Sequence, residues 1–511
     1  MNNNINHIQA PDQIALANIY AFTDEESEVI SNSNNKQRQK TNIKDVLVKD
    51  ILREAHLFID DRKEAHAIIL VGAHKEILAV RGEDFSSWII KKVWDTYGKT
   101  ISTMAVKDIV NSIEAHAKFG GIQYKLNLRV AGDDKSIYYD LVNRNWEIVE
   151  IDASGWRINN NPLAFFKRYK TQNEQVRPVG GGDINSIFRY INVKEADKLL
   201  FLVYLISCFI PEIAHPIGVF YGEKGSAKTT ASKVMKMIID PSIMPTITFP
   251  KNNEELIQNL AHNWFCNFDN ISNIGDTTSD TLCRAVTGEG YSKRGIYTNE
   301  DDVVFTYKRC VSLNGIDVIP KKDDLLDRSI LFELDRIQDS NRKGEYKLLE
   351  ELRLVMPEIL GSIFDILSKA IRVYSDSSTI KLNRMADFTS WGYAIAEAIG
   401  GLGSEFLSRY NKNINKQNLE AINSNSFASA VVALLDSNQS WSGKASDLMV
   451  ALETVAERER IHTDSSDFPT TSNMVSKKLK SIKSNLERLG IEFEIKRTNT
   501  NNIIHLRRSG S

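Results

Sequence analysis

Residues Pro216-Ile-Gly-Val-Phe-Tyr221 form an apolar run that leads into Gly222-Glu-Lys-Gly-Ser-Ala-Lys-Thr-Thr230, and residues 231–239 continue with a helical pattern. Strand, glycine-bearing loop and helix in this order are typical of a phosphate-binding P-loop, whose pattern is G-x-x-x-x-G-K-[ST]. The sequence departs from this pattern at the second glycine, where Ala227 stands. Alanine still donates its backbone N–H and has a small side chain, so we expect it to be tolerated. The alternative is an ordinary lysine-bearing turn.

The loop offers the chemical groups that bind a nucleoside triphosphate. Backbone N–H groups wrap the β-phosphate, a lysine ammonium reaches the β- and γ-phosphates, and a hydroxyl binds Mg²⁺. Here the ammonium belongs to Lys228 and the hydroxyl to Thr229. We therefore expect ATP and Mg²⁺ as ligands, and the expected cofactor-binding residues are Gly222, Gly225, Ser226, Ala227, Lys228, Thr229 and Thr230.

Composition narrows the class of protein. The 511 residues are 42% hydrophobic and 25% charged, which is typical of a soluble globular protein of about three or four domains. The net charge of −2 means that a nucleic-acid surface must be local. The four cysteines are dispersed and form no C-x-x-C pair, which argues against zinc and disulfides. The longest apolar run is too short for a membrane span, and no signal-peptide pattern begins the chain, so we expect a cytoplasmic protein without a membrane partner.

Pattern and composition divide the chain into five parts. Residues 1–42 are rich in Asn, Gln, Ser and Glu and predict a disordered tail. Residues 43–180 mix helices and strands and predict an α+β accessory domain whose later strands extend one sheet. We assign residues 181–340 to an ATPase core, 341–425 to a helical lid and 427–511 to a compact end domain.

Two features of the accessory region are open to more than one interpretation. Asp60-Asp61 and Asp133-Asp134 are either metal carboxylates or solvated turns, and we favour turns because no third ligand has suitable spacing. Gly180-Gly-Gly182 is a plausible linker into the ATPase core.

Three segments after the P-loop end in polar side chains. Asn263–Asn270 is an apolar strand ending in an acid, so Asp269 is a candidate for binding Mg²⁺ through a water molecule, or else a helix cap. Cys310–Gly315 is another apolar strand, and Asn314 at its polar tip can orient an attacking water. Arg328 lies on a predicted surface turn, which suits an arginine finger that completes a neighbouring subunit's site and therefore requires an oligomer.

A hairpin-like pair, 288–297 and 303–309, lies between the two polar strands. Cations there are candidate contacts for the DNA backbone, although loop lysines are as often simply solvated. The candidate residues are Lys293, Arg294, Lys308 and Arg309.

The end of the chain is locally basic. Two helices, a third helix expected from Thr471 or Ser472 to Leu489, and a two-stranded hairpin predict a winged helix. Residues 477–508 hold nine Lys or Arg and three Glu, a local charge of +6 that suits phosphates, although winged helices also bind proteins. The expected DNA-binding residues are Lys477, Lys478, Lys480 and Lys483 on one recognition helix, with Arg497 and Arg507.

The stretch Gly222–Ser329 resembles the ATPase core of AAA+ helicases of mobile elements, phages and viruses, especially superfamily 3 and the poxvirus-type primase-helicases, and more distantly the minichromosome-maintenance helicases. The order of P-loop, acidic strand, T-G-x-G…K-R…Y segment (Thr287–Tyr297), strand ending in Asn, and arginine is similar. The resemblance implies an α/β AAA+ P-loop core with a helical lid and a homo-oligomeric ring, a hexamer. It also implies single-stranded DNA in the channel, with duplex DNA at the winged helix.

The resemblance assigns roles to four residues and suggests a fifth. Lys228, Asp269, Asn314 and Arg328 become the catalytic set, and Arg384 at a later helix start becomes a candidate for touching the γ-phosphate. One position departs from the pattern, because Asn270 occupies the place of a glutamate general base and cannot accept a proton. Either another acid serves, such as Glu289 or Asp280, or hydrolysis is slow.

Together these patterns predict an ATP-driven DNA helicase, translocase or replication initiator of a mobile element or phage. The alternatives are an ATP-dependent switch or assembly protein that binds DNA without unwinding it, and a P-loop ATPase that acts on a protein partner.

Overall fold

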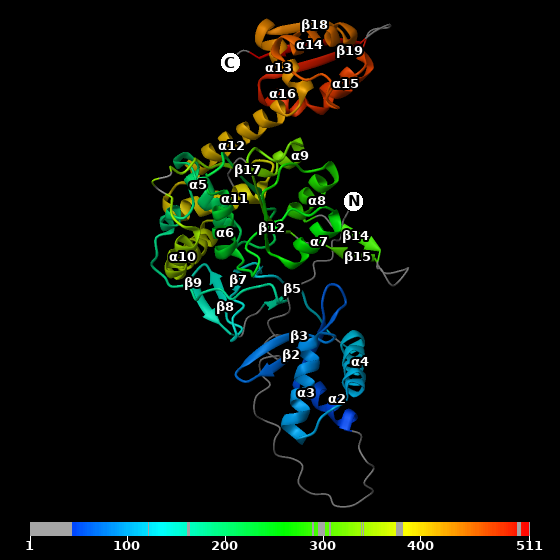
Figure 1. Cartoon of the computed structure of the whole chain (residues 1–511), viewed down its shortest axis with the longest axis vertical. Coiled ribbons are helices and arrows are strands. Elements are labelled where there is room, and N and C mark those ends of the chain that lie inside the picture. The colour runs from blue at the N-terminus through cyan, green and yellow to red at the C-terminus, as the bar shows by residue number, and fades with distance from the viewer. Residues whose placement is uncertain are drawn as a thin grey trace, which may run out of the picture.

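The computed structural model describes the chain in segments (Figure 1). Residues 1–42, for which the sequence predicts disorder, lie outside the described residues. Figure 1 shows three bodies in chain order, an N-terminal α/β unit, a large central body and a C-terminal unit joined to it by a helix. The described residues are 43–120, 122–160, 164–288, 291–294, 302–305, 308–338, 340, 342–374, 382–497 and 502–509.

The N-terminal unit packs three helices against one sheet of order β3-β2-β1-β4. Along its last helix, Val106, Ile109, Val110, Ile113 and Ala117 are buried at helical spacing, which explains the local fold. These residues belong to a core that this unit does not share with the rest of the chain. The elements are α2 (Ile43–Glu54), β1 (His56–Ile59), β2 (Ala65–Val71), β3 (His74–Ala79), α3 (Glu83–Tyr97), α4 (Thr103–Gly120) and β4 (Ile122–Gln123).

The next strands do not extend that sheet, so the prediction of one continuous sheet was wrong. They form a separate antiparallel meander of order β6-β7-β8-β9. Tyr139, Val149 and Ile151 of the meander share a hydrophobic core with helices of the central body. These strands pack on the central body because their apolar side chains are buried in its larger core. The elements are β6 (Val130–Gly132), β7 (Ser136–Asp140), β8 (Ile148–Asp152) and β9 (Gly155–Asn159), beside a small pair of β5 (Leu126–Asn127) and β10 (Phe165–Phe166).

A buried ionic cluster joins the meander to the central body. Arg129, which is fully buried, donates to Asp240 (Nε–Oδ1 3.0 Å), and Lys236 donates to the other oxygen of that carboxylate (2.8 Å). The same Oδ2 accepts the backbone N–H groups of Trp264 (3.0 Å) and Phe265 (3.2 Å). Burial acts to raise the pKa of Asp240, but Lys236 and Arg129 outweigh it and lower the pKa to about 2.

The central body contains a five-stranded parallel sheet of order β12-β13-β16-β11-β17. The first strand in sequence, β11, therefore lies between the fourth and the fifth. Apolar strands buried on both faces are expected in such a sheet, and β16 is buried along its whole length. The elements are α5 (Lys198–Ser207), β11 (Ile217–Tyr221), α6 (Lys228–Ile239), β12 (Ile247–Thr248), α7 (Asn253–His262), β13 (Phe265–Asp269), α8 (Asp276–Thr287), β14 (Tyr291–Arg294), β15 (Asp302–Phe305), β16 (Cys310–Gly315), α9 (Asp323–Leu326) and β17 (Ser329–Glu333), and η1 (Ile184–Arg189) and η2 (Glu195–Asp197) precede α5.

Three long helices follow the sheet, α10 (Glu345–Tyr374), α11 (Ala386–Gly400) and α12 (Gly403–Asn423). The triglycine segment before the core is no free linker, because Val179 N–H donates to Pro357 O of α10 (2.9 Å). The Asn-rich end of α12 contains buried amides. Asn413 pairs with both the N–H (3.0 Å) and the carbonyl (2.8 Å) of Leu331, and Gln417 donates to the carbonyl of Ser329 (2.5 Å).

The C-terminal unit has its own core and a sheet of order β18-β20-β19. The sequence predicts one helix to Leu489, but the structure divides it at Ile482, whose φ of −103° and ψ of 12° leave the helical region. Lys483 therefore does not share a helix with Lys477, Lys478 and Lys480. The elements are α13 (Ser426–Asn438), β18 (Ser440–Lys444), α14 (Ala445–Glu459), α15 (Ser472–Ser481), α16 (Lys483–Arg488), β19 (Ile491–Arg497) and β20 (Asn502–Arg508).

Candidate nucleotide-binding site

The P-loop connects the buried strand β11 to helix α6 at the carboxyl edge of the parallel sheet. Three of its residues have a positive φ: Gly222 (147°), Gly225 (86°) and Ala227 (61°). The first two conformations suit glycine. Ala227 has a left-handed conformation that strains a residue with a Cβ, so the departure from the P-loop pattern carries a conformational cost.

Lys228 turns back over the loop. Its Nζ donates to the carbonyl oxygens of Gly222 (2.7 Å) and Glu223 (2.9 Å) and approaches the Ser226 hydroxyl (3.3 Å). Burial lowers the pKa of Lys228, and the charge of Asp269 opposes this effect. The ammonium thus lies over the concave side of the loop, where phosphates bind in P-loops.

Thr229 and Asp269 meet although they are distant in sequence. The Thr229 hydroxyl donates to Asp269 Oδ1 at 3.1 Å. Asp269 ends β13, and Thr229 lies in the first turn of α6, so the parallel sheet brings both to the same edge. A hydroxyl and a carboxylate are hard oxygen ligands, and this pair fits a Mg²⁺ ion held with phosphate oxygens and water.

Asn314 joins the strand ends at the centre of the site. Its side chain is 2% exposed, its amide donates to Ser232 of α6 (Nδ2–Oγ 3.0 Å), and its Oδ1 accepts the backbone N–H of Asn270 (2.9 Å). Asn270 has a φ of 54°, a conformation that asparagine tolerates better than most residues. The positive φ of this turn is a physical reason for asparagine at position 270, where the resemblance to AAA+ helicases predicts glutamate.

Asp280, one of the two acids proposed as substitutes for that glutamate, does not lie free at the site. Asp280 pairs with Lys322 (2.8 Å) on the surface. Glu289 lies outside the described residues.

The chain after β17 returns across the P-loop, which the sequence did not predict. We call residues 334–345 the crossing segment; residues 339 and 341 within it are outside the description. Leu334 N–H donates to Tyr221 O (2.9 Å) and Ile337 N–H donates to Gly225 O (3.2 Å). Further along, Glu345 accepts from Lys233 of α6 (2.8 Å) and from the Thr230 hydroxyl (3.3 Å).

Arg328 lies at the opposite edge of the sheet. Its carbonyl accepts the N–H of Ile217, the first residue of β11 (2.7 Å), while the P-loop follows the last residue. At 3.3 Å per residue the strand separates the two by roughly 13 Å. The guanidinium binds Asp324, both at the carbonyl (3.0 Å) and at the carboxylate.

Arg384, a candidate for touching the γ-phosphate, also lies at this edge. It donates to Asp324 (2.7 Å) and Asp327 (2.5 Å), so within one chain it does not lie at the P-loop. Arg488 of the C-terminal unit binds the same Asp327 (2.9 Å). Burial acts to raise the pKa of Asp324, but Arg328 and Arg384 outweigh it and lower the pKa.

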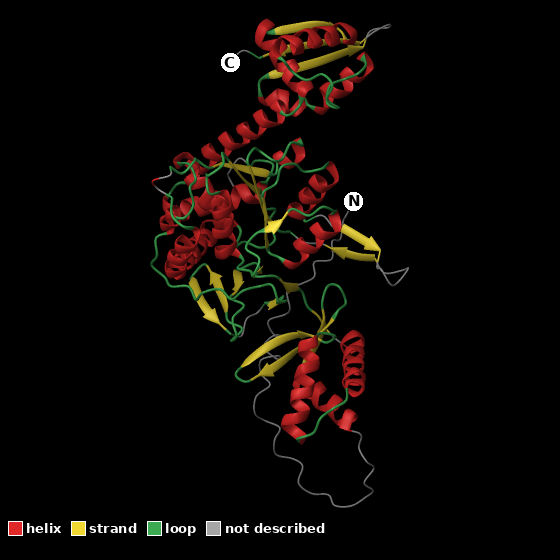
Figure 2. Ribbon diagram, viewed as in Figure 1, coloured by secondary structure: helices red, strands yellow, loops and turns green. Residues whose placement is uncertain are grey.

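The candidate DNA contacts of the hairpin divide into two pairs. Figures 1 and 2 show β14 and β15 projecting from the central body. The strand register places Lys293 opposite Val303. The side chains of Lys293 and Arg294 lie outside the described residues. Lys308 donates to Glu212 O, and Arg309 donates to Leu260 O (Nε–O 2.7 Å), so both serve contacts within the chain.

The C-terminal candidates also differ from one another. Lys477 and Lys480 are exposed on α15, whereas Lys478 donates to Ser466 O (2.9 Å). Lys483 on α16 pairs with Glu487 (3.4 Å), and Arg507 pairs with Glu492 (3.0 Å). The side chain of Arg497 lies outside the described residues.

Two features of the N-terminal unit lie away from the P-loop. Asp60 is buried rather than solvated, and its carboxylate, that of Glu64 and the His66 ring come within 4.8 Å of one another. Each already has a protein partner, because Asp60 accepts the N–H groups of Arg62 and Glu64 and contacts His66 (3.2 Å), and Glu64 pairs with Lys167 (2.9 Å).

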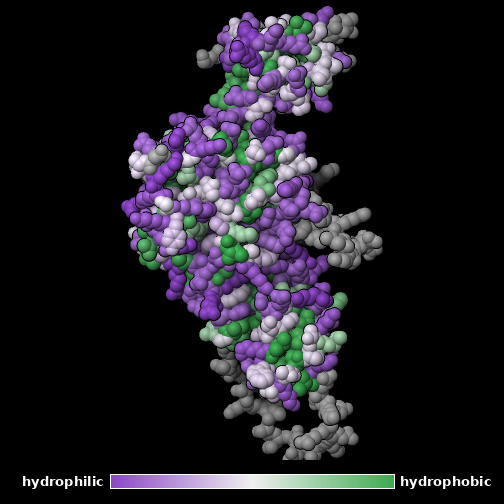
Figure 3. Space-filling model, viewed as in Figure 1, coloured by the Kyte–Doolittle hydropathy of each residue, from purple (hydrophilic) through white to green (hydrophobic). Residues whose placement is uncertain are grey.

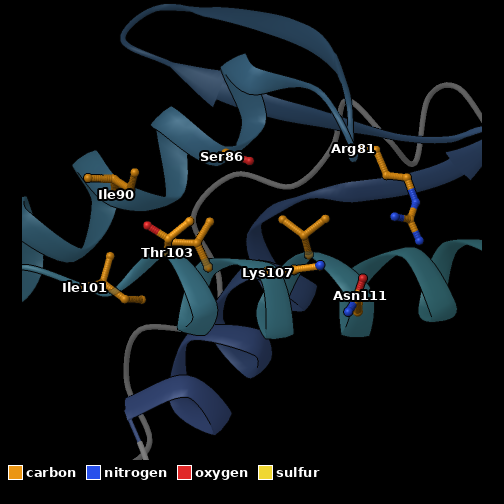
Figure 4. A pocket seen from close by; sticks show the side chains of 9 residues that line it. Arg81, Ser86, Ile90, Ile101, Thr103, Lys107 and Asn111 are labelled. Atoms are coloured by element: carbon orange, nitrogen blue, oxygen red, sulfur yellow. The ribbon is translucent and has the colours of Figure 1, made fainter.

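The second feature is a pocket of about 300 Å³ between α3 and α4, whose lining includes Ile90, Ile101 and Lys107 (Figure 4). Arg81 at its rim is held by Glu114 (Nε–Oε1 2.8 Å). Figure 3 shows apolar side chains on the visible face of this unit.

The parallel sheet, with the P-loop at its carboxyl edge, places the central body in the α/β class. Two family models match consecutive parts of the chain: the actinomycete integrative conjugative element replication protein over residues 184–420, and the C-terminal domain of its RepA over residues 427–511. Each model matches less than half of the chain, and over these residues the chain is similar to this family of replication proteins.

Comparison with solved structures finds weaker likenesses. Two apo structures of the NrS-1 C-terminal region are 11% and 12% identical, with TM-scores of 0.40 and 0.41, and cover 91% of this chain and 98% of that one. A JCV helicase with a bound phenylacetamide compound is 12% identical over 42% of this chain and 66% of that one, with a TM-score of 0.21. These scores are too low to identify a shared fold. No curated protein matches. Among the described helices, none combines the length and apolarity needed to cross a membrane.

Proposed function

We propose that this replication protein is an AAA+ ATPase that hydrolyses ATP to move along or unwind DNA during replication of its element. The observation that carries the proposal is the contact between Thr229 and Asp269 beside the P-loop, with Asn314 between their strands. Numbered along the chain, the sheet has the strand order 5-1-4-3-2, which suits an AAA+ core. The following helices α10–α12 suit its lid.

In this proposal the chain's own residues bind and orient the triphosphate. Backbone N–H groups of the P-loop surround the β-phosphate, and Lys228 moves from the loop carbonyls to the β- and γ-phosphates. Thr229 and Asp269 would hold Mg²⁺, which would neutralise phosphate charge. Asn314 links α6 to the turn at Asn270 through its bonds to Ser232 and to the Asn270 N–H, and so positions the end of β16 beside the P-loop helix.

A complete site requires two copies of the chain. Because Arg328 lies at the far edge of the sheet, it reaches a nucleotide only in a neighbouring subunit, as an arginine finger does. We propose a ring, a hexamer by resemblance. The protruding β14–β15 hairpin then faces the single strand with Lys293 and Arg294, and the proposed DNA interface excludes Lys308 and Arg309.

The C-terminal unit suits a winged helix that binds duplex DNA. Its order of helix, strand, three further helical segments (α14, α15 and α16) and a two-stranded wing suits that motif, with α15 and α16 in place of one helix. Lys477 and Lys480 are the exposed cations on the segment that corresponds to the recognition helix. Their phosphate contacts would make binding dependent on salt.

The decisive experiment compares ATP hydrolysis and unwinding of a forked duplex by wild-type protein and Lys228→Ala. We expect hydrolysis to fall roughly 100-fold or more, since charge-assisted hydrogen bonds are worth about 1.5–3 kcal/mol each, and unwinding to stop. Lys224→Ala, which removes an exposed lysine from the same loop, is the matched control and should retain both activities. Hydrolysis that survives in Lys228→Ala would overturn the assignment of the site.

A second candidate function is an ATP-dependent switch that binds DNA without separating its strands. Asn270 is the observation that favours it, because an amide in a strained turn cannot act as a general base. Wild-type protein that hydrolyses ATP on DNA but never separates strands at any salt concentration would support this second function against the first.

A further inference from the structure

The crossing segment places a second cation at the P-loop from within the same chain. Arg342 Nη2 lies 2.7 Å from the position that a Cβ on Gly225 would occupy. Gly225 therefore has two reasons to be glycine, its φ of 86° and the guanidinium packed against it. Lys228 belongs to the P-loop and Arg342 packs against it, so both cations lie at the same short loop although more than a hundred residues separate them in sequence.

The position of Arg342 is fixed from both sides. On one side, Ile337 N–H donates to Gly225 O (3.2 Å), and on the other, Glu345 binds Lys233 (2.8 Å) and Thr230 (3.3 Å) at the start of α6. Glu345 also begins α10, so the segment joins the rigid helix to the loop. An arginine held between two such anchors loses little conformational freedom when it binds a ligand.

The chemistry of the position suits phosphate oxygens. A planar guanidinium donates in a fork that matches two phosphate oxygens, and it stays protonated at any pH of interest. Arg342 is exposed, so a ligand can reach it, and the loop beneath supplies backbone N–H groups that bind the same phosphates. Arg342 thus differs from Arg328, which lies beyond the reach of its own P-loop.

We propose that Arg342 binds the phosphate chain of ATP in the subunit that carries it, as the second fixed cation of the site beside Lys228. The proposal rests on the proposed function, because it assumes that the P-loop binds a nucleoside triphosphate.

The test is calorimetric titration of the full-length chain with the slowly hydrolysed analogue MgATPγS. We expect Arg342→Ala to bind roughly tenfold more weakly than wild type, which corresponds to one charge-assisted contact, and Arg342→Lys to keep part of the affinity. Lys343→Ala, which removes the neighbouring exposed cation paired with Glu351, is the control and should bind as wild type.

Three other results would overturn the proposal. If Arg342→Ala binds MgATPγS within twofold of wild type while Lys228→Ala loses binding, Arg342 is not part of the site. The proposed function then still stands. If wild type does not bind MgATPγS, or if Lys228→Ala binds it as well as wild type, the proposed function itself is refuted. Loss of single-stranded DNA binding by Arg342→Ala without nucleotide would assign the arginine to DNA phosphates instead.

Discussion

The two edges of the parallel sheet differ in what they hold. At the carboxyl edge, Thr229 contacts Asp269 (3.1 Å), Lys228 binds the P-loop carbonyl of Gly222 (2.7 Å), and Asn314 binds Ser232 (3.0 Å) and the N–H of Asn270 (2.9 Å). One chain therefore places these groups at one edge by itself. At the amino edge, Arg328 faces Asp324, and the P-loop lies a strand length away. The difference supports the proposal that the chain carries two complementary halves of one site at opposite ends of the same strands.

The largest effect is expected when the two halves of the site are intact on two different variants of the protein. We expect Arg328→Ala to lose DNA-stimulated ATP hydrolysis by about 1,000-fold or more, the range of an arginine finger, while still binding nucleotide. Mixed with inactive Lys228→Ala, it should regain measurable hydrolysis, because some interfaces then pair an intact P-loop with an intact Arg328. Lys322→Ala, an exposed cation near the same turn, serves as the control. If the two inactive variants stay inactive when they are mixed, the proposal that neighbouring subunits share each site is contradicted.

A second prediction concerns the amino edge as a structural element. Asp240→Ala leaves Lys236 and Arg129 buried without their counter-charge and should cost about 3–5 kcal/mol of unfolding free energy, measured by urea denaturation. Since folding lowers the pKa of Asp240 from 3.8 to about 2, wild type has this contribution above pH 3.8 and loses it as the pH falls toward 2.

The exposed substitution Glu223→Ala is the control for Asp240→Ala and should change the unfolding free energy by less than about 0.5 kcal/mol. A loss below about 1 kcal/mol for Asp240→Ala would mean that the ionic cluster does not join the meander to the sheet.

The smallest expected effect lies at the carboxyl edge. Ala227→Gly relieves the left-handed conformation and should raise the unfolding free energy by at most about 1 kcal/mol, since the gain is partly offset by the greater freedom of glycine in the unfolded chain. Ala231→Gly, in the interior of α6, should instead lower it by about 1 kcal/mol or more. Destabilisation by Ala227→Gly would show that the turn is not strained.

The sequence predicts what is encoded locally around the P-loop. Cys310–Gly315 is a strand with the predicted bounds, and the region 341–425, for which the sequence predicts helices, contains α10 (Glu345–Tyr374). An apolar run bounded by polar residues predicts a strand, and a periodic apolar stripe predicts a helix. Both patterns can be recognised within a short window of sequence. Because parallel strands end at one edge, the same patterns also indicate that Asp269 and Asn314 lie near Lys228.

The sequence does not predict contacts that depend on where the chain returns. Nothing in the residues around Arg342 indicates that it packs on Gly225, since the contact depends on the path after β17. The Asn-rich end of α12 appears unsuited to a helix until its amides find backbone partners on β17. The break at Ile482 likewise follows from packing in the C-terminal unit rather than from composition.

The amides of α12 have a consequence for how copies of the chain can meet. The outer strand of a sheet normally offers free backbone groups to which another chain can add a strand. Here Asn413 occupies both backbone groups of Leu331, and at the opposite edge β12 is only two residues long. Asn413 therefore blocks strand addition at Leu331, and the short β12 offers few backbone groups at the opposite border, so both borders of this sheet resist the aggregation that strand addition starts.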